Sequence, residues 1–243
     1  MSALLEVKGL TKRFGGVTAV DACSFTVPEG SVTALVGPNG SGKTTAFNLI
    51  TGYARADAGT VSFAGTTVRR PDPVRLARRG LTRTFQQARI FADLTLVQNL
   101  VAALQQPWRV ALRRAVRAHE WSRALELLEE FGIARLAHER AGNLSYGQKK
   151  LLEFATVLMG EPRLVLLDEP TAGVNPVLVE QIEERIRDLN ARGLTFLVVE
   201  HNMNLVMRLC DPVVVLDHGT KLAEGRPDDV RNDPRVLDAY LGG

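Results

Sequence analysis

Long hydrophobic runs are missing from this chain of 243 residues. No apolar stretch approaches the roughly 20 residues that a membrane-spanning helix requires. The strongest runs, at 164–167 and 213–216, have the length of buried strands instead. The first residues also lack the basic and then apolar layout of a secretion signal. We therefore expect the chain to remain in the cytoplasm.

Cysteine is scarce as well, with only Cys23 and Cys210 in the sequence. The two are far apart and each has apolar neighbours, whereas a metal or redox site would show paired spacing or nearby histidines. Both are therefore expected to be buried structural residues.

A strong charge imbalance is also absent. The net charge is only +3, which is too weak to indicate a nucleic-acid partner by itself. Arginine is nevertheless dense in two clusters, and we interpret both as solvated helix faces. Contact with an anionic membrane surface is the alternative. The clusters consist of Arg69, Arg70, Arg75, Arg78, Arg79 and Arg83, and of Arg109, Arg113, Arg114 and Arg117.

What the chain does contain is a glycine-rich segment at 37–44, Gly-Pro-Asn-Gly-Ser-Gly-Lys-Thr, which fits the phosphate-binding pattern G-x-x-x-x-G-K-[ST]. In this phosphate loop, glycines let backbone N–H groups close around phosphate oxygens. Lys43 can reach the β- and γ-phosphates, and the Thr44 hydroxyl can ligate Mg²⁺. A strand expected at 31–36 precedes the loop, and a helix expected at 43–52 points its N-terminus at the phosphates. The segment therefore predicts binding of a nucleoside triphosphate.

The order of the expected elements indicates an α/β core with a helical insertion. Strand-like patterns at 4–8, 18–27 and 59–63 give the first part an antiparallel character. From about 95 to 160 the sequence is mostly helical. Strands and helices then alternate, which predicts βαβ units in a parallel sheet. The alternating elements are expected at 163–167, 176–190, 194–199, 202–209 and 212–217.

Within the helical part, four apolar residues follow one another at helical spacing. They are Trp121, Leu125, Leu128 and Phe131, with charged residues between them. This spacing predicts a single packed helix face.

Two acids follow the apolar strand expected at 163–167. Asp168 can hold Mg²⁺ directly or through water, and Glu169 can polarise an attacking water. A single acid after an apolar strand would be weak evidence. A pair of acids in a chain that also has a phosphate loop indicates phosphoryl transfer, because that reaction needs both a metal and an oriented nucleophile.

Ser145 precedes a strongly helical segment at 149–159 and is suited to be its N-cap. Together with Gly147, which permits close backbone approach, it could form a second anion site at a helix N-terminus. The alternative is an ordinary helix cap, and these residues alone favour that simpler interpretation.

In their order along the chain, four features resemble the ATP-binding subunit of ABC transporters. They are the phosphate loop, Leu-Ser-Tyr-Gly-Gln at 144–148 (the signature segment), the acids at 168–169 and His201. The likeness runs essentially end to end. It implies a single domain over 1–243 with an α/β, RecA-like P-loop NTPase core, an N-terminal antiparallel β-subdomain and an inserted α-helical subdomain. The implied core comprises 1–86 and 161–243, and the implied helical subdomain 87–160.

The resemblance also implies a catalytic role for some residues and nucleotide contacts for others. Glu169 resembles the general base, and His201 the histidine that contacts the γ-phosphate. Phe14 matches the aromatic residue that stacks on adenine, with a core phenylalanine as the alternative. The implied cofactors are ATP and Mg²⁺. The implied nucleotide-binding residues also include Gly37, Pro38, Asn39, Gly40, Ser41, Gly42, Lys43, Thr44, Thr45, Ser145, Tyr146, Gly147 and Gln148.

The metal ligands implied by the resemblance are Thr44, Gln86 and Asp168. Gln86 matches the glutamine that senses both Mg²⁺ and the membrane subunit, and its neighbour Gln87 leaves the register open.

Two departures from the commonest family pattern indicate a subgroup. Tyr146 replaces the first glycine of Ser-Gly-Gly-Gln, and Asn175 stands where most members have Asp. Both forms, and the C-terminal stretch, look like the importers of branched-chain and related hydrophobic amino acids. Urea importers and lipopolysaccharide exporters are the alternatives, since close relatives of the subgroup carry out those tasks.

The resemblance implies several partners and a location at the inner face of the cell membrane. The partners are integral-membrane permease subunits, a second ATPase subunit facing this one head to tail, and indirectly a substrate-binding protein. The second subunit is either a copy of this chain or a related chain, and importers of this kind favour the latter. No nucleic acid is implied.

Two readings from other classes have less support. A soluble ABC-type ATPase that acts on nucleic acid would usually carry two cassettes, a long coiled-coil insertion or zinc cysteines, and this sequence has none of these. A GTPase switch would carry Asn-Lys-x-Asp, which the Asn-Ala-Arg-Gly at 190–193 does not match.

Overall fold

The computed structural model of the chain describes residues 2–84, 90–104 and 114–241. Its centre is a six-stranded sheet in the order β10-β9-β3-β8-β7-β6. Neighbouring strands are parallel except β10, which runs antiparallel to β9. The strands are β3 (Val32–Val36), β6 (Leu81–Arg83), β7 (Leu164–Asp168), β8 (Thr195–Val199), β9 (Val213–Asp217) and β10 (Thr220–Gly225).

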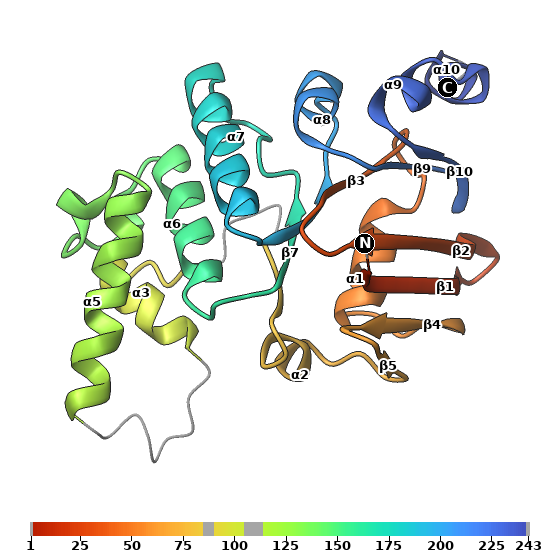
Figure 1. Cartoon of the computed structure of the whole chain (residues 1–243). Helices are drawn as coiled ribbons and strands as arrows, with labels where there is room; N and C mark the ends of the chain where they lie inside the picture. Colours follow the sequence, from red (N-terminus) through yellow and green to blue (C-terminus); the bar gives the residue numbers. More distant parts are fainter. Residues whose placement is uncertain (1, 85–89, 105–113, 242–243) are drawn as a thin grey trace.

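A second, antiparallel sheet of four strands lies beside the first (Figure 1), in the order β2-β1-β4-β5. Buried and more exposed residues alternate along parts of β1 and β2, as expected for a sheet with one face on the core. The strands are β1 (Ala3–Phe14), β2 (Val17–Pro28), β4 (Ala58–Phe63) and β5 (Thr66–Val68).

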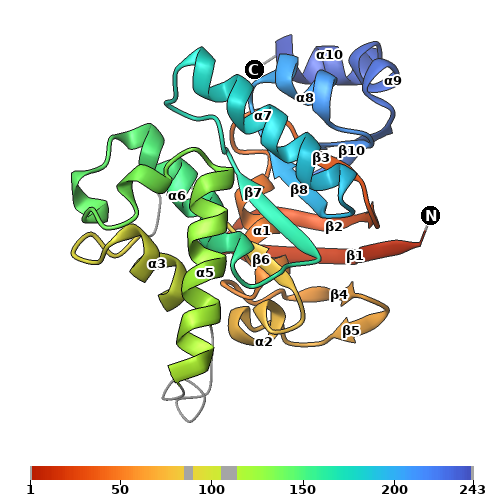
Figure 2. The same ribbon diagram turned by 60° about the vertical axis from the view of Figure 1, so that its left-hand side comes forward.

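Both faces of the parallel sheet are buried, which explains why β3, β7 and β8 are almost continuously apolar. Leu35 and Leu166 face the cluster formed with α1 (Lys43–Thr51) and the antiparallel sheet. Their neighbours Val36 and Leu167 face the opposite cluster, to which several helices contribute. The sheet is therefore the middle layer between these two groups of elements (Figure 2).

The helical segment occurs in the chain between β6 and β7 and occupies one side of the molecule (Figure 1). It contains two short 3₁₀ turns, Ala134–Leu136 and Ala141–Asn143. Its described helices are α3 (Leu96–Ala103), α5 (Arg114–Glu130) and α6 (Tyr146–Leu158). Besides α1, the other helices in the described ranges are α2 (Pro73–Ala77), α7 (Pro176–Ala191), α8 (Met203–Leu209), α9 (Pro227–Arg231) and α10 (Pro234–Leu241).

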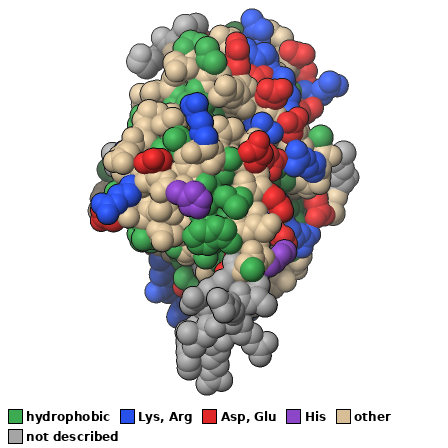
Figure 3. Space-filling model, turned by 90° about the vertical axis from the view of Figure 1, so that its left-hand side faces the viewer, with side chains coloured by type: hydrophobic (Ala, Val, Ile, Leu, Met, Phe, Trp, Pro, Cys, Tyr) green, Lys and Arg blue, Asp and Glu red, His purple; other side chains and the backbone are tan. Residues whose placement is uncertain are grey.

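The prediction of one packed face on α5 was partly wrong. Leu128 is fully buried, but Trp121 and Leu125 are 38% and 36% exposed. The packed stripe is centred on Ala124 and Leu127, which are both fully buried. Figure 3 views this side of the molecule and shows hydrophobic side chains exposed among charged ones.

Both cysteines are free and buried, as the sequence predicts. Burial raises the pKa of Cys23 to about 11 and that of Cys210 to about 12. Thiols held in this way are poor nucleophiles at neutral pH. Among the described residues, no helix is both long enough and apolar enough to cross a bilayer.

Candidate nucleotide-binding and hydrolysis site

The phosphate loop connects β3 to α1 and contains two positions where only glycine fits. Gly37 and Gly42 have φ values of +149° and +99°. A Cβ on Gly37 would lie 2.0 Å from the backbone oxygen of Leu216, and one on Gly42 would lie 2.3 Å from that of Ala19. The loop is thus packed against neighbouring backbone and keeps a shape that side chains at these positions would destroy.

The N-terminus of α1 is open to a ligand. Gly42 is its N-cap, and no side chain caps the helix. Because the first N–H groups of a helix have no partner within it, an uncapped start offers donors to an anion. The start of α1 therefore fits the phosphate groups of a nucleotide.

Lys43 places its ammonium group inside the phosphate loop. Its side chain is nearly buried, and Nζ donates to the backbone oxygens of Gly37 and Pro38, both at 2.8 Å, and to Ser41 Oγ at 3.3 Å. Burial lowers the pKa of Lys43, and the negative charge of Glu169 opposes this change. The loop thus holds the ammonium group of Lys43, and the charge of Glu169 acts on it.

Glu169 and His201 meet at the carboxyl ends of adjacent strands. Strands β3, β8 and β7 are parallel neighbours, so the loops that follow them lie at one edge of the sheet. Glu169 Oε1 lies 2.7 Å from His201 Nε2. Its backbone has a φ of +48°, which is unusual for a residue other than glycine and common at functional sites.

The donors available for a metal are hard oxygens. Asp168 is the last residue of β7 and is 5% exposed, and Thr44 presents an exposed hydroxyl in the first turn of α1. Hydroxyl and carboxylate oxygens fit Mg²⁺, which usually takes one or two carboxylates and completes its shell with water and phosphate. No group of three or more His, Cys, Asp or Glu suited to a metal occurs in the described part of the chain. Gln86, the third expected ligand, lies outside the described residues.

The signature segment forms a helix start that caps itself. Ser145 Oγ accepts from the backbone N–H of Gln148 at 3.3 Å, and Gln148 Oε1 accepts from that of Ser145 at 2.9 Å. The Tyr146 hydroxyl donates to the backbone oxygen of Ala172 at 3.1 Å. The first two contacts close the cap of α6, and the tyrosine contact joins the signature segment to the loop that precedes α7.

The start of α7 also contacts the signature segment. A Cβ added to Gly147 would lie 2.6 Å from Leu178 Cδ2. Asn175 caps α7 by accepting from the backbone N–H of Leu178 at 2.9 Å. Asn175 is therefore suited to its position as a helix cap.

Phe14 is not a core residue. It ends β1, is 54% exposed, and has Lys12 Nζ 5.2 Å from its ring centroid. The alternative of a buried structural phenylalanine is therefore excluded, and the ring is accessible to a planar ligand.

Two residues at this edge of the sheet were missed as site components. Glu200 is 3% exposed, and its carboxylate accepts from the backbone N–H groups of Thr171, His201 and Asn202 at 2.9, 3.0 and 3.2 Å. It thereby joins the loops after β7 and β8. An acid at the end of an apolar strand, directly before His201, was the available signal.

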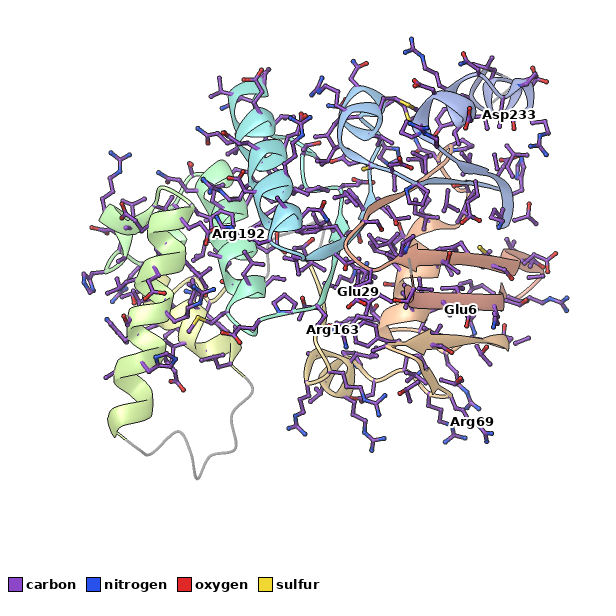
Figure 4. All side chains as sticks on the ribbon, viewed as in Figure 1. Glu6, Glu29, Arg69, Arg163, Arg192 and Asp233 are labelled. Atoms are coloured by element: carbon purple, nitrogen blue, oxygen red, sulfur yellow. The ribbon has the colours of Figure 1, made fainter. Side chains whose placement is uncertain are left out.

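Arg83 is the second missed residue, and the interpretation of its cluster as a solvated face was wrong for it. Arg69 does point away from the fold (Figure 4), and Arg78 and Arg79 are exposed. The Arg83 side chain, by contrast, is 5% exposed and pairs with Asp168 at 2.6 Å. It is buried where the end of β6 meets α1 and the end of β7.

A cavity of about 460 Å³ lies between the core and the helical segment. Val74 of α2, Leu104 after α3 and Val157 of α6 contribute to its lining, as does Arg83. Of these lining residues, Arg83 is close in the sequence to residues 85–89, which the structure does not describe.

A glycine-rich loop between a central parallel strand and an uncapped helix, with acids on a nearby strand, defines a P-loop NTPase. Comparison with known proteins identifies the family. The family model described as ABC transporter matches residues 20–172, and the one described as branched-chain amino acid ATP-binding cassette transporter matches residues 220–243. The chain belongs to the ABC transporter family and is the ATP-hydrolysing subunit of a transporter.

Individual relatives and structures agree with this assignment. The high-affinity branched-chain amino acid transport ATP-binding proteins LivG of Salmonella typhimurium and BraF of Pseudomonas aeruginosa are each 39% identical to this chain, with 98% of both chains covered. The ADP conformation of MJ1267, an ATP-binding cassette of an ABC transporter, has a TM-score of 0.88 and 34% identity over 100% of both chains. The fold class expected from the sequence is thus confirmed.

A further solved structure is relevant to assembly. It is a dimeric post-hydrolysis state of the ATP-binding cassette MJ0796, bound to ADP and phosphate. It is 25% identical to this chain, with a TM-score of 0.78, and covers 92% of this chain and 98% of that one.

Proposed function

We propose that this chain hydrolyses ATP to drive the import of branched-chain or related hydrophobic amino acids across the cytoplasmic membrane. The observation that carries the hydrolysis is the pair of Glu169 and His201, 2.7 Å apart at the edge of the parallel sheet where the phosphate loop also begins. Support for the substrate class comes from the printed names of LivG and BraF and from the matched C-terminal residues 220–243.

In this proposal, each group at the site has one task. The phosphate loop and Thr45 surround the phosphates, and Phe14 stacks on adenine. Glu169 accepts a proton from the water that attacks the γ-phosphorus. His201 contacts the γ-phosphate, and its 2.7 Å contact with Glu169 holds the two side chains together.

Thr44, Asp168 and Gln86 are the residues proposed to hold Mg²⁺. When bound, this ion neutralises charge on the phosphate oxygens. Of these residues, Asp168 contributes a carboxylate fixed at a strand end and Thr44 a hydroxyl in the first turn of α1.

The signature segment is proposed to act on the nucleotide of a second subunit. In Figure 1, α6 lies on the helical side of the molecule and α1 in the α/β part. Ser145, Tyr146, Gly147 and Gln148 would then contact the γ-phosphate held by the partner's phosphate loop, in a head-to-tail pair. The dimeric MJ0796 structure is consistent with such a pair. The isolated chain is thus expected to bind ATP well and hydrolyse it poorly, and a related but different chain is the favoured partner.

The cavity between the core and the helical segment is proposed to receive permease helices. It lies next to Arg83, three residues before Gln86 in the sequence. We propose the boundary of the helical subdomain at 87–160, with 1–86 and 161–243 as the core. The chain would then be peripheral on the inner face of the membrane, and would serve a substrate-binding protein through the permeases.

Uptake of labelled leucine tests the proposal. Cells that lack this gene should lose high-affinity uptake and regain it with the wild-type chain, but not with Glu169→Gln at equal protein level. A matched control is Glu129→Gln, which changes an exposed acid of α5 and should restore uptake fully. Normal leucine uptake without the gene would refute the substrate class.

A further inference from the structure

Arg83 connects three elements around the candidate site. It ends β6, and its guanidinium donates through Nη2 to Asp168 Oδ2 at 2.6 Å, at the end of β7. Through Nη1 it donates to two residues of α1, Asn48 Oδ1 at 2.7 Å and Thr51 Oγ1 at 3.3 Å. One side chain thus joins the helix that follows the phosphate loop to the carboxylate proposed to hold Mg²⁺.

Aromatic rings fix the orientation of the same guanidinium. Its central carbon lies 5.4 Å from the ring centroid of Phe47 and 5.9 Å from that of Tyr53. A planar guanidinium can stack on rings while it donates in several directions, whereas a lysine ammonium offers a compact charge on a flexible chain. The surroundings of residue 83 therefore suit arginine in particular.

Asp168 is held at two levels by residues 83 and 84. Its backbone N–H donates to Thr84 Oγ1 at 3.2 Å, and the backbone N–H of Thr84 donates to Leu166 at 2.9 Å. The bond from Arg83 to Oδ2 restricts rotation of the carboxylate and therefore the direction in which Oδ1 points. Partners that orient a metal ligand in this way contribute strongly to metal affinity.

We propose that Arg83 is a positioning residue that orients the Asp168 carboxylate for the metal–nucleotide complex. The inference rests on the proposed function of Asp168. Stability alone is a weak explanation of the pair. Its two side chains are only 5% and 6% exposed, and a buried ion pair often stabilises a fold no better than apolar side chains of similar volume.

The test measures binding of a fluorescent ATP analogue to the purified full chain, in EDTA and with Mg²⁺. For Arg83→Met we expect the same affinity for the analogue as the wild type in EDTA. The increase in affinity on addition of Mg²⁺ (the Mg²⁺ gain) should be about 10- to 100-fold smaller than in the wild type, as is typical when the partner of a metal ligand is removed. Arg83→Lys keeps the charge but not the fork of donors, so it should show an intermediate loss.

Arg163→Met is the matched control. Arg163 directly precedes β7, so it lies at the opposite end of the same strand from Asp168 (Figure 4). It pairs with Glu29 at 2.7 Å, and both side chains are about half exposed. This variant should keep the wild-type response to Mg²⁺.

Each outcome has a distinct meaning. If both Arg83 variants keep the full Mg²⁺ gain of the wild type, the inference is wrong and the proposed function stands. Equal losses in EDTA and in Mg²⁺ would mean that Arg83 only stabilises the fold, which also overturns the inference. The Arg83→Lys variant decides the matter should Arg83→Met fail to fold. A wild-type chain that binds no nucleotide would instead refute the proposed function.

Discussion

The N-termini of α1 and α6 both resemble anion sites in the sequence, but they differ in the structure. At α1, Gly42 leaves the first N–H groups uncapped, and the side chain of Lys43, the first residue of the helix, donates back into the phosphate loop. At α6, Ser145 and Gln148 cap the helix reciprocally. The first site is built to receive a ligand within one chain. The second has its donors partly engaged, and we propose that it contacts a ligand bound by another subunit. A helix start therefore indicates an anion site only when the groups that cap it are also known.

The largest effect is expected at Glu169, the acid that pairs with His201. Glu169→Gln should lower ATP hydrolysis by the assembled transporter by about 10²- to 10⁴-fold, the usual contribution of a general base. ATP binding should persist, because the amide keeps the shape of the side chain. Phosphate release and nucleotide affinity, measured side by side, check this. Glu129→Gln serves again as the control, and steady hydrolysis by Glu169→Gln would remove Glu169 from the role of base.

The next effect separates the two helix starts by ATP affinity. Lys43→Ala should weaken ATP binding by about 10- to 100-fold, since hydrogen bonds to charged groups contribute about 1.5–3 kcal/mol. Titration with a fluorescent ATP analogue measures it.

Lys8→Ala is the control for this titration. Lys8 pairs with Glu6, and its side chain is 64% exposed. Normal ATP affinity in the Lys43→Ala chain would contradict the assignment of the phosphate loop.

The third effect concerns the packing of α6 against α7. Alanine ordinarily favours a helix over glycine by up to about 1 kcal/mol. At Gly147, however, the added Cβ would meet Leu178 at 2.6 Å. Overpacking of this kind costs about 1–3 kcal/mol. Gly147→Ala should therefore lower the free energy of unfolding, as measured by urea denaturation.

Two further variants complete this third test. Gly160→Ala is the matched control, because a Cβ there would meet nothing within 4 Å. Adding Leu178→Ala to Gly147→Ala should cost less than the sum of the two single changes. Additive effects would show that the two residues do not press on each other.

The same comparison shows how far sequence reasoning can go. Lys43 and Glu169 were predicted because their signals are local: a strand, a loop and a helix in order, or a strand that ends in acids. Arg83 was misread because its partner Asp168 lies 85 positions away in the sequence, so only the pairing of β6 with β7 brings them together. On α5, the small side chain of Ala124 was overlooked although it lies at the centre of the packed stripe.

The smallest effect tests whether the α6 start has a function beyond its cap. Ser145→Ala removes one half of the reciprocal cap and should cost about 1 kcal/mol of stability. It should leave ATP affinity of the isolated chain unchanged, because the phosphate loop and Lys43 are intact. In the assembled transporter it should lower hydrolysis further than this loss of stability explains, since Ser145 would face the partner's γ-phosphate.

Thr95→Ala is the matched control for this last effect. Thr95 caps α3 with Gln98 in the same reciprocal arrangement, so its loss should cost similar stability. If both variants lower hydrolysis equally, Ser145 is only a helix cap. If Ser145→Ala alone lowers it, the self-capped helix start of α6 must supply its serine to a ligand bound by another subunit. The difference between α1 and α6 would then be that α1 binds the nucleotide of its own chain, whereas α6 completes the nucleotide site of the partner.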